Sequence, residues 1–160
     1  MTEMAAALAD PNQPAATFEA LERRVDAVIG VKLFTLMTFN EASGIAQRFH
    51  SNMPDVYPVS GEKKTEPNDW VDQVLARSET FVANSIEEIA AVFPDHELIQ
   101  SLGCESCINI PVVVAGKVRG TLNCLHEAGH YTPDRIAASE DLKEPGALAL
   151  LLAENMKEMA

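Results

Sequence analysis

Residues 103–126, GCESCINIPVVVAGKVRGTLNCLH, decide the fold that this sequence predicts. Residues 106–114 are mostly apolar and β-branched, as a half-buried strand requires. Residues 115–117, Ala-Gly-Lys, supply a tight turn in which Gly116 can adopt a positive φ. Residues 118–126 then return as a second strand. The pattern therefore predicts a β-hairpin, and all three cysteines of the chain lie in this stretch.

The composition is that of a globular domain with an acidic surface. The chain has 160 residues, of which 47% are hydrophobic and 22% charged, and its net charge is −12. A chain of this length can bury a substantial core as one domain. The negative charge argues against polyanionic partners, so we expect neither nucleic acid nor an anionic membrane surface. The odd number of cysteines and the lack of a basic leader or a long apolar run favour a cytoplasmic protein.

The remaining elements follow from apolar periodicity and from the positions of glycine and proline. We expect a flexible lead-in over residues 1–16 and a single domain over residues 17–160. Thr17 is expected to cap the first helix, and Pro145-Gly146 to break or kink the last one. The other expected elements are, in order, strands at 31–39 and 45–50, an irregular loop at 51–68, a short helix near Trp70, a short strand at 80–83, helices at 85–91 and 94–102, and a helix from Thr132 onward.

The order of these elements predicts an α+β fold. Hairpins imply antiparallel pairing, and amphipathic helices at both ends of the chain need an apolar surface to cover. The sheet should therefore be antiparallel, with the N- and C-terminal helices on one face. The long loop and short helices in the middle of the chain would cover the other face. A cavity between the sheet and this covering segment is the natural ligand site.

These elements resemble a GAF domain, a PAS-related sensory fold, from about Thr17 to the end of the chain. The stretches that carry the resemblance are VKLFTLMTF (31–39), FPDHELIQSLG (93–103), INIPVVVAGKVRGTLNCLH (108–126) and the helix after YTPDR (131–135). The resemblance implies a stand-alone sensor in signal transduction that binds a small molecule between the sheet and its cover. It also implies a homodimer formed through the terminal helices and a separate effector protein. It names no cofactor, because the motifs of the cyclic-nucleotide-binding and bilin-binding members do not occur here.

Two alternative functions remain open. The FPDH stretch is similar to the region before the central strands of free methionine-(R)-sulfoxide reductase, a thiol-dependent enzyme of this fold. That enzyme uses cysteines in the covering segment, whereas here no cysteine precedes Cys104. The second alternative is a dimeric interaction module with a filled core and no ligand. We favour a binding module over an enzyme and assign no catalytic residue.

The hairpin supplies four candidates for ligand binding. Asn109, Thr121 and Asn123 could share the cavity-facing side of the hairpin, and Cys107 lies two residues before Asn109. Asparagine is depleted in strands, and a buried amide needs hydrogen-bond partners. These amides therefore either form part of the cavity floor or hold the backbone of the covering loop.

The second strand and the covering segment supply the other candidates, Arg48, His50, Tyr57 and Trp70. Arg48 and His50 share a face by the period of two. An inward Arg48 would bind a carboxylate or a phosphate in a bidentate manner. Tyr57 and Trp70 would line an apolar wall. The alternatives are a solvated strand face for the first pair and ordinary core packing for the second.

The cysteines and histidines of the hairpin could form a thiol site or a metal site. Cys104 and Cys107 form C-E-S-C, the spacing of redox dithiols and of half zinc sites. Cys124 and His126 share a face of the last strand, where Cys107 could face them and His130 could add a zinc ligand. Free cysteine, however, is among the most buried residue types. We therefore expect buried thiols and no metal.

Overall fold

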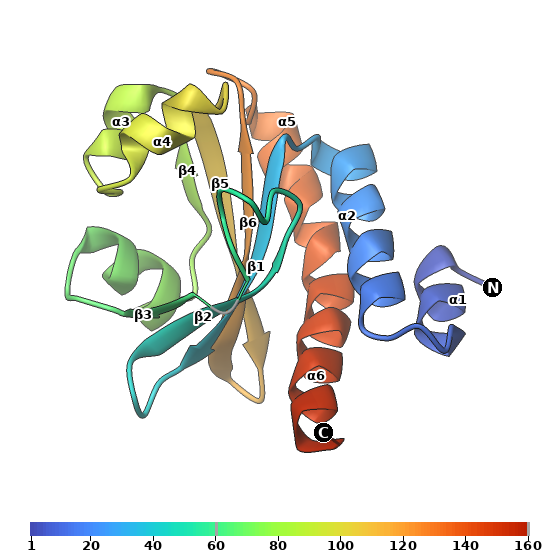
Figure 1. Cartoon of the computed structure of the whole chain (residues 1–160). Helices are drawn as coiled ribbons and strands as arrows, with labels where there is room; N and C mark the ends of the chain where they lie inside the picture. The colour runs from blue at the N-terminus through green and yellow to red at the C-terminus, as the bar shows by residue number, and fades with distance from the viewer. Residues whose placement is uncertain (60, 160) are drawn as a thin grey trace.

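A single antiparallel sheet forms the centre of the molecule, and helices lie on both of its faces (Figure 1). The computed structural model describes residues 1–59 and 61–159, with side chains up to residue 156. Within these residues six strands pair in the order β3-β2-β1-β6-β5-β4. Their bounds are β1 (Leu33–Asn40), β2 (Ile45–Ser51), β3 (Glu62–Lys64), β4 (Phe81–Ala83), β5 (Ser106–Val114) and β6 (Lys117–His126). The predicted α+β fold with an antiparallel sheet is thus confirmed.

The predicted central hairpin is β5 and β6. Its two-residue turn places Ala115 at φ 53° and Gly116 at φ 77°. Positive φ at both central positions is the geometry of a type I′ turn, whose twist matches that of paired strands. Lys117 consequently starts β6 instead of belonging to the turn. Beside the turn Val114 pairs with Lys117 and Val113 with Val118, and a register shift between Val112 and Val113 then adds one residue to β6. The turn and this bulge together place Asn109 directly opposite Asn123.

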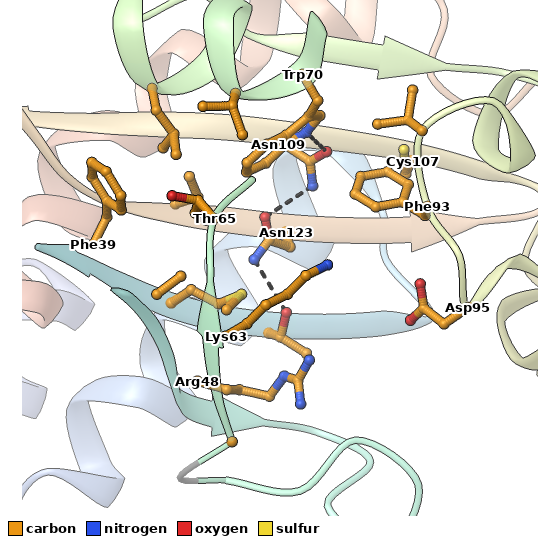
Figure 2. A pocket seen from close by; sticks show the side chains of 18 of the residues that line it. Phe39, Arg48, Lys63, Thr65, Trp70, Phe93, Asp95, Cys107, Asn109 and Asn123 are labelled. Atoms are coloured by element: carbon orange, nitrogen blue, oxygen red, sulfur yellow. Dashed lines mark hydrogen bonds between the residues drawn. The ribbon is translucent and has the colours of Figure 1, made fainter. Parts of the chain in front are cut away.

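One face of the sheet is covered by the middle of the chain. Three short elements lie there: the π-helical turn η1 (Val71–Ala76) and the helices α3 (Ile86–Ala90) and α4 (His96–Ser101). The buried apolar residues on this side form a small cluster: Leu33, Tyr57, Ala83, Ile89, Ile99, Cys104, Cys107 and Leu125. Figure 2 shows the space that remains between this covering layer and the sheet.

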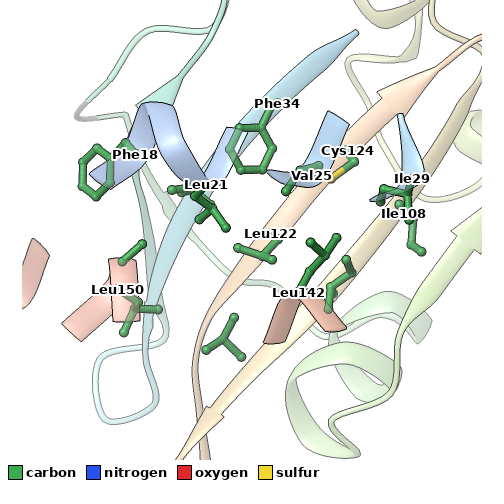
Figure 3. Close-up of a cluster of buried hydrophobic side chains, with 14 of the residues drawn as sticks. Phe18, Leu21, Val25, Ile29, Phe34, Ile108, Leu122, Cys124, Leu142 and Leu150 are labelled. Carbon is green, nitrogen blue, oxygen red and sulfur yellow. The ribbon is translucent and has the colours of Figure 1, made fainter. Parts of the chain in front are cut away.

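The opposite face carries the larger apolar core, beneath the terminal helices. The helices on this side are α2 (Ala15–Ile29), α5 (Pro133–Ala138), the 3-10 turn η2 (Ser139–Leu142) and α6 (Lys143–Met159), and α1 (Glu3–Ala9) packs against α2. Figure 3 shows the cluster, which includes Phe18, Leu21, Val25, Ile29, Phe34, Ile108, Leu122, Cys124, Leu142 and Leu150. The terminal helices therefore lie on one face, as predicted.

Two glycines allow α6 to lie close to the sheet. A Cβ added to Gly120 of β6 would lie 2.3 Å from Leu150 Cδ1 and 2.3 Å from the Met37 carbonyl oxygen. A Cβ added to Gly146 of α6 would lie 3.0 Å from Cδ1 of Leu122. Contacts this short would push the helix and the neighbouring strand apart. The missing side chains at these two positions are therefore a condition for the packing of this layer.

The N-terminal segment differs from the flexible lead-in expected over residues 1–16. Its alanine-rich sequence EMAAALA forms α1, in keeping with the high helix propensity of alanine. The Glu3 carboxylate of α1 pairs with Arg23 of α2 at 2.7 Å. Because α2 starts before Thr17, this residue is buried within the helix instead of capping it, and its hydroxyl donates to Gln13 Oε1 at 2.8 Å.

The C-terminal helix is interrupted earlier than predicted. Pro145-Gly146 does not break α6, because the helix begins at Lys143 and Pro145 falls in its first turn. A proline there removes no intrahelical hydrogen bond, since the first N–H groups of a helix have no intrahelical partner. The interruption is the 3-10 turn η2, just before α6.

Among the described residues, no helix combines the length and the apolar character needed to cross a bilayer.

Replacing Gly120 with alanine is expected to lower the free energy of unfolding by about 1–3 kcal/mol or more, because the new methyl group meets a backbone carbonyl that cannot move aside. Urea denaturation followed by circular dichroism measures this change. Gly61→Ala is the matched control, since its Cβ would meet nothing closer than 3.6 Å. Equal stabilities of the two variants would contradict the close approach of α6.

Candidate functional site

A cavity of about 270 Å³ lies between the sheet and the covering segment (Figure 2). It is lined by seven of the eight residues predicted from the sequence as ligand-binding candidates: Arg48, Tyr57, Trp70, Cys107, Asn109, Thr121 and Asn123. Five of these come from strands β2, β5 and β6, and the other two come from the covering segment. The structure therefore brings together residues that are up to 75 positions apart, here from 48 to 123.

The floor of the cavity is a chain of hydrogen bonds between side chains. The indole Nε1 of Trp70 donates to Asn109 Oδ1 at 2.9 Å. Asn109 Nδ2 donates to Asn123 Oδ1 at 2.9 Å, and Asn123 Nδ2 lies 3.3 Å from Thr35 Oγ1. Both asparagines are more than 90% buried. The amides thus satisfy one another and tie the cover to the sheet through the Trp70 side chain, not through the loop backbone that was the other expectation.

His50 does not line the cavity, and the prediction that it shares a face with Arg48 is wrong. The pairing of β1 and β2 shifts by one residue, from Leu36 opposite His50 to Met37 opposite Arg48. The extra residue, Phe49, forms a β-bulge that reverses the alternation at this point. His50 consequently faces the helix layer, where its ring packs against Phe18 and Phe34 and its Nε2 lies 3.3 Å from Glu22.

Arg48 is held at one end of the cavity by the covering loop. Its guanidinium carbon lies 4.8 Å from the centroid of the Tyr57 ring, and its Nη1 donates to the Pro58 carbonyl oxygen at 3.2 Å. The Tyr57 hydroxyl donates to Asp95 Oδ2 at 2.5 Å. Burial, followed by the hydrogen bond to Asp95, raises the pKa of Tyr57, so this phenol is a hydrogen-bond donor at neutral pH.

Several residues of the cavity wall were not predicted. Phe93 packs edge-on against Trp70, with ring centroids 6.1 Å apart, and Asp95 follows it in the chain. Lys63 lines the cavity from β3, a strand that lies within the irregular loop predicted at residues 51–68. The sequence Glu-Lys-Lys of β3 has no apolar alternation, so periodicity could not reveal it. The FPDH stretch was noted only through its family resemblance.

The three cysteines are buried and free. Burial raises the pKa of Cys104 and raises that of Cys107 to about 12. Burial also raises the pKa of Cys124. A nucleophilic thiol needs a lowered pKa, so these thiols lack the activation that a thiol-dependent enzyme requires. Only Cys107 reaches the cavity, and its pairing opposite Leu125 places it on the other face of the hairpin from Cys124.

The hairpin ends in a histidine pair rather than in a Cys/His cluster. Residues 126–130 read H-E-A-G-H, a spacing that binds zinc when it lies on a helix, but here it spans the end of β6 and a turn. Ring nitrogens of His126 and His130 and a Glu127 oxygen lie within 4.8 Å of one another. The two rings stack face to face, however, with centroids 3.5 Å apart. Imidazole binds metals in its own plane, so the stack presents no common coordination point.

The stacked pair docks the hairpin end on the helix layer. His130 Nε2 lies 2.7 Å from the Ile29 carbonyl oxygen, and His126 Nδ1 accepts from the Glu127 backbone N–H at 2.9 Å. A Cβ on Gly30 would lie 2.7 Å from His130 Nε2, so only glycine fits beneath the ring. We interpret this pair as a structural contact between β6 and the end of α2.

Comparison with known proteins connects this architecture to a family. The family model described as the GAF domain matches residues 15–144, which is most of the chain. No curated protein sequence gives a significant match.

Solved structures of low sequence identity share the fold. The GAF domain of a phosphoenolpyruvate-protein phosphotransferase from Coxiella burnetii superposes with a TM-score of 0.70 at 17% identity, over 98% of this chain and 92% of that one. The GAF domain of a two-component sensor histidine kinase from Bacillus halodurans gives 0.69 at 14% identity, over 91% and 98%. The chromophore-binding domain of a bacteriophytochrome from R. palustris gives 0.64 at 12% identity, over 96% of this chain and 60% of that one.

The two buried amides are expected to be energetically coupled. Asn109→Leu should lower the free energy of unfolding by about 1–3 kcal/mol, because it leaves the Trp70 indole and an Asn123 oxygen without partners. In a double-mutant cycle with Asn123→Leu, measured by urea denaturation, the coupling energy should be about 0.5–3 kcal/mol. Additive effects of the two substitutions would show that the amides act independently.

Stability should also fall in mild acid because of the histidine pair. Burial lowers the pKa of His126, and the adjacent His130 and the Lys32 ammonium lower it further, against the opposing effect of Glu127. The folded state therefore binds fewer protons than the unfolded state, whose histidine pKa is about 6.5. The stability that depends on neutral His126 is complete above the unfolded pKa of about 6.5. It is lost as the pH falls below that pKa toward the lower pKa of His126 in the folded state.

The measurement is urea denaturation at about pH 7.5 and about pH 5.5, on either side of the unfolded histidine pKa. His126→Gln should be less stable than the wild type at the higher pH and should show a smaller loss on acidification. An unchanged loss in this variant would assign the acid sensitivity to other groups.

Proposed function

Because this chain belongs to the GAF domain family, we propose that it is a sensor module that binds a small molecule between the sheet and its covering segment. The main support is the cavity itself. It is partly enclosed by aromatic and aliphatic side chains and contains a few convergent polar groups, which is the composition of small-molecule sites. Its volume of about 270 Å³ lies just below the usual range of about 300–1,000 Å³ for such sites, so the ligand should be compact.

The covering segment is the part that a ligand would reposition. It touches the sheet through Trp70 and through the loop that holds Tyr57 against Arg48, and the cavity lies between these two contacts. A ligand that binds one arrangement of the cover more tightly than another shifts the population toward it. We propose that this shift is passed to a separate effector protein and that the terminal helices on the opposite face mediate a homodimer.

The single tryptophan of the chain provides a direct test. Trp70 lines the cavity and donates a hydrogen bond to its floor, so occupancy should change its fluorescence. A library of metabolites is screened for a saturable change in emission. Each hit should also raise the melting temperature, because a ligand that binds only the folded state stabilises it. Native mass spectrometry of the freshly purified protein provides a second readout of bound mass.

Trp70→Phe is a suitable control, since it keeps an aromatic wall while removing the fluorophore and the indole donor. A true ligand should still raise the melting temperature of this variant. If no compound in a broad library alters the fluorescence or the melting temperature, and no bound mass is detected, the proposal of a small-molecule sensor is rejected.

A further inference from the structure

We propose that the ligand of this cavity carries a carboxylate and that the free edge of the Arg48 guanidinium binds it. This inference rests on the proposed function, because it assigns the ligand chemistry of the same cavity. It depends on Arg48, whose N–H donors mostly have no partner among the described residues.

The guanidinium group of Arg48 has more N–H donors than the described residues around it have acceptors for them. Its Nη1 is the one nitrogen with a hydrogen bond among the described residues, to the Pro58 carbonyl oxygen at 3.2 Å. Its Nε is buried and has no acceptor in the described part of the chain. Within those residues Arg48 also has no carboxylate within the 4.0 Å of an ion pair. A buried donor on a charged group is costly when it is unpaired, so an acceptor from a bound molecule would be stabilising.

The unused donors lie on one edge of the group. Nε and the second terminal nitrogen, Nη2, point the same way, and their two parallel N–H groups match the two oxygens of a carboxylate. Because Nε is fully covered, an oxygen reaches it only when the covering segment shifts, which is the movement that the proposed function assigns to ligand binding. The cation–π contact with the Tyr57 ring restrains the guanidinium group, and the hydrogen bond from Tyr57 to Asp95 holds the ring in turn. A fork that is already oriented loses little conformational entropy on binding, which favours affinity.

The protein's own carboxylates near the cavity do not take the place of the ligand's carboxylate. Asp95 is engaged by the Tyr57 hydroxyl and acts on the Arg48 charge only from beyond the 4.0 Å of an ion pair. Glu62 and Glu66 also line the cavity, but both are exposed at its rim, where water and salt screen their charges. Lys63, on the same rim, adds a second positive charge beside the entrance.

The rest of the cavity suits the apolar body of such a molecule. The amides of the floor are already paired with each other and with Trp70, so they place little demand on the ligand. The rings of Trp70 and Phe93 form an edge-to-face wall. A compact carboxylic acid with an aromatic or aliphatic body therefore fits both the charge and the size of the site.

The experiment compares acids with their neutral amides by isothermal titration calorimetry. The probes are benzoate with benzamide and hexanoate with hexanamide, together with inorganic phosphate. At least one carboxylate should bind at least about tenfold more tightly than its amide, the difference expected for a charge-assisted pair of hydrogen bonds. Arg48→Gln should abolish this preference, and Arg48→Lys should restore only part of it, because lysine keeps the charge without the fork.

Arg24→Gln on the exposed side of α2 is the matched control, since it makes the same change of charge away from the cavity. Equal binding of acids and amides, binding of phosphate in place of carboxylates, or full carboxylate binding by Arg48→Gln would each overturn the inference. The comparison of acid and amide on the wild-type protein stands even if the Arg48 variants fold poorly. If no carboxylate binds at millimolar concentration while neutral compounds alter Trp70 fluorescence, the inference fails and the sensor proposal survives.

Discussion

The register between β5 and β6 is the constraint on which the rest of this structure depends. Side chains alternate between the two faces of a strand, so one register decides what each face receives. Ile108 and Cys124 are paired and point into the helix-side core, whereas Asn109 and Asn123 are paired and point into the cavity. A slip by one residue would bury the amides under the terminal helices, among the apolar side chains of the larger core. The short turn at Ala115 and Gly116 and the bulge that follows it, at the step from Val112 to Val113, together set this register.

The alternation is also broken in β2, and this break gives the cavity a positive side chain. The bulge at Phe49 turns Arg48 toward the covering segment while His50 stays with the helix layer. A regular strand would send both residues to one side. An acidic chain with a net charge of −12 thereby places a positive group where the described residues supply no carboxylate to pair with it. A local irregularity of the backbone, not the overall charge, places this cation in the site.

Much of the candidate site could be read from the sequence because it lies on regular strands. The asparagines stood out as residues that are unfavourable in strands, and the period of two placed them on one face. The prediction for His50 failed because a bulge leaves no trace in a pattern of alternation. Phe93 and Asp95 went unassigned because their place in the cavity wall depends on how the covering segment contacts the sheet, which the helix predicted at 94–102 does not reveal. The bend of the chain at η2 was missed for a related reason, since Pro145 can end a helix or begin one.

By itself, the sequence determined the class of fold, the central hairpin and the face on which the two buried amides lie. These features follow from local patterns: β-branched runs, a glycine able to adopt a positive φ, and helix periodicity at both ends of the chain. Tertiary structure alone decided that a cavity remains beneath the cover, that Arg48 points into it, and that Cys124 lies on the opposite face of the sheet from Cys104 and Cys107. The physical reason is that packing between distant segments sets volumes and orientations, whereas neighbouring residues set only the local backbone conformation.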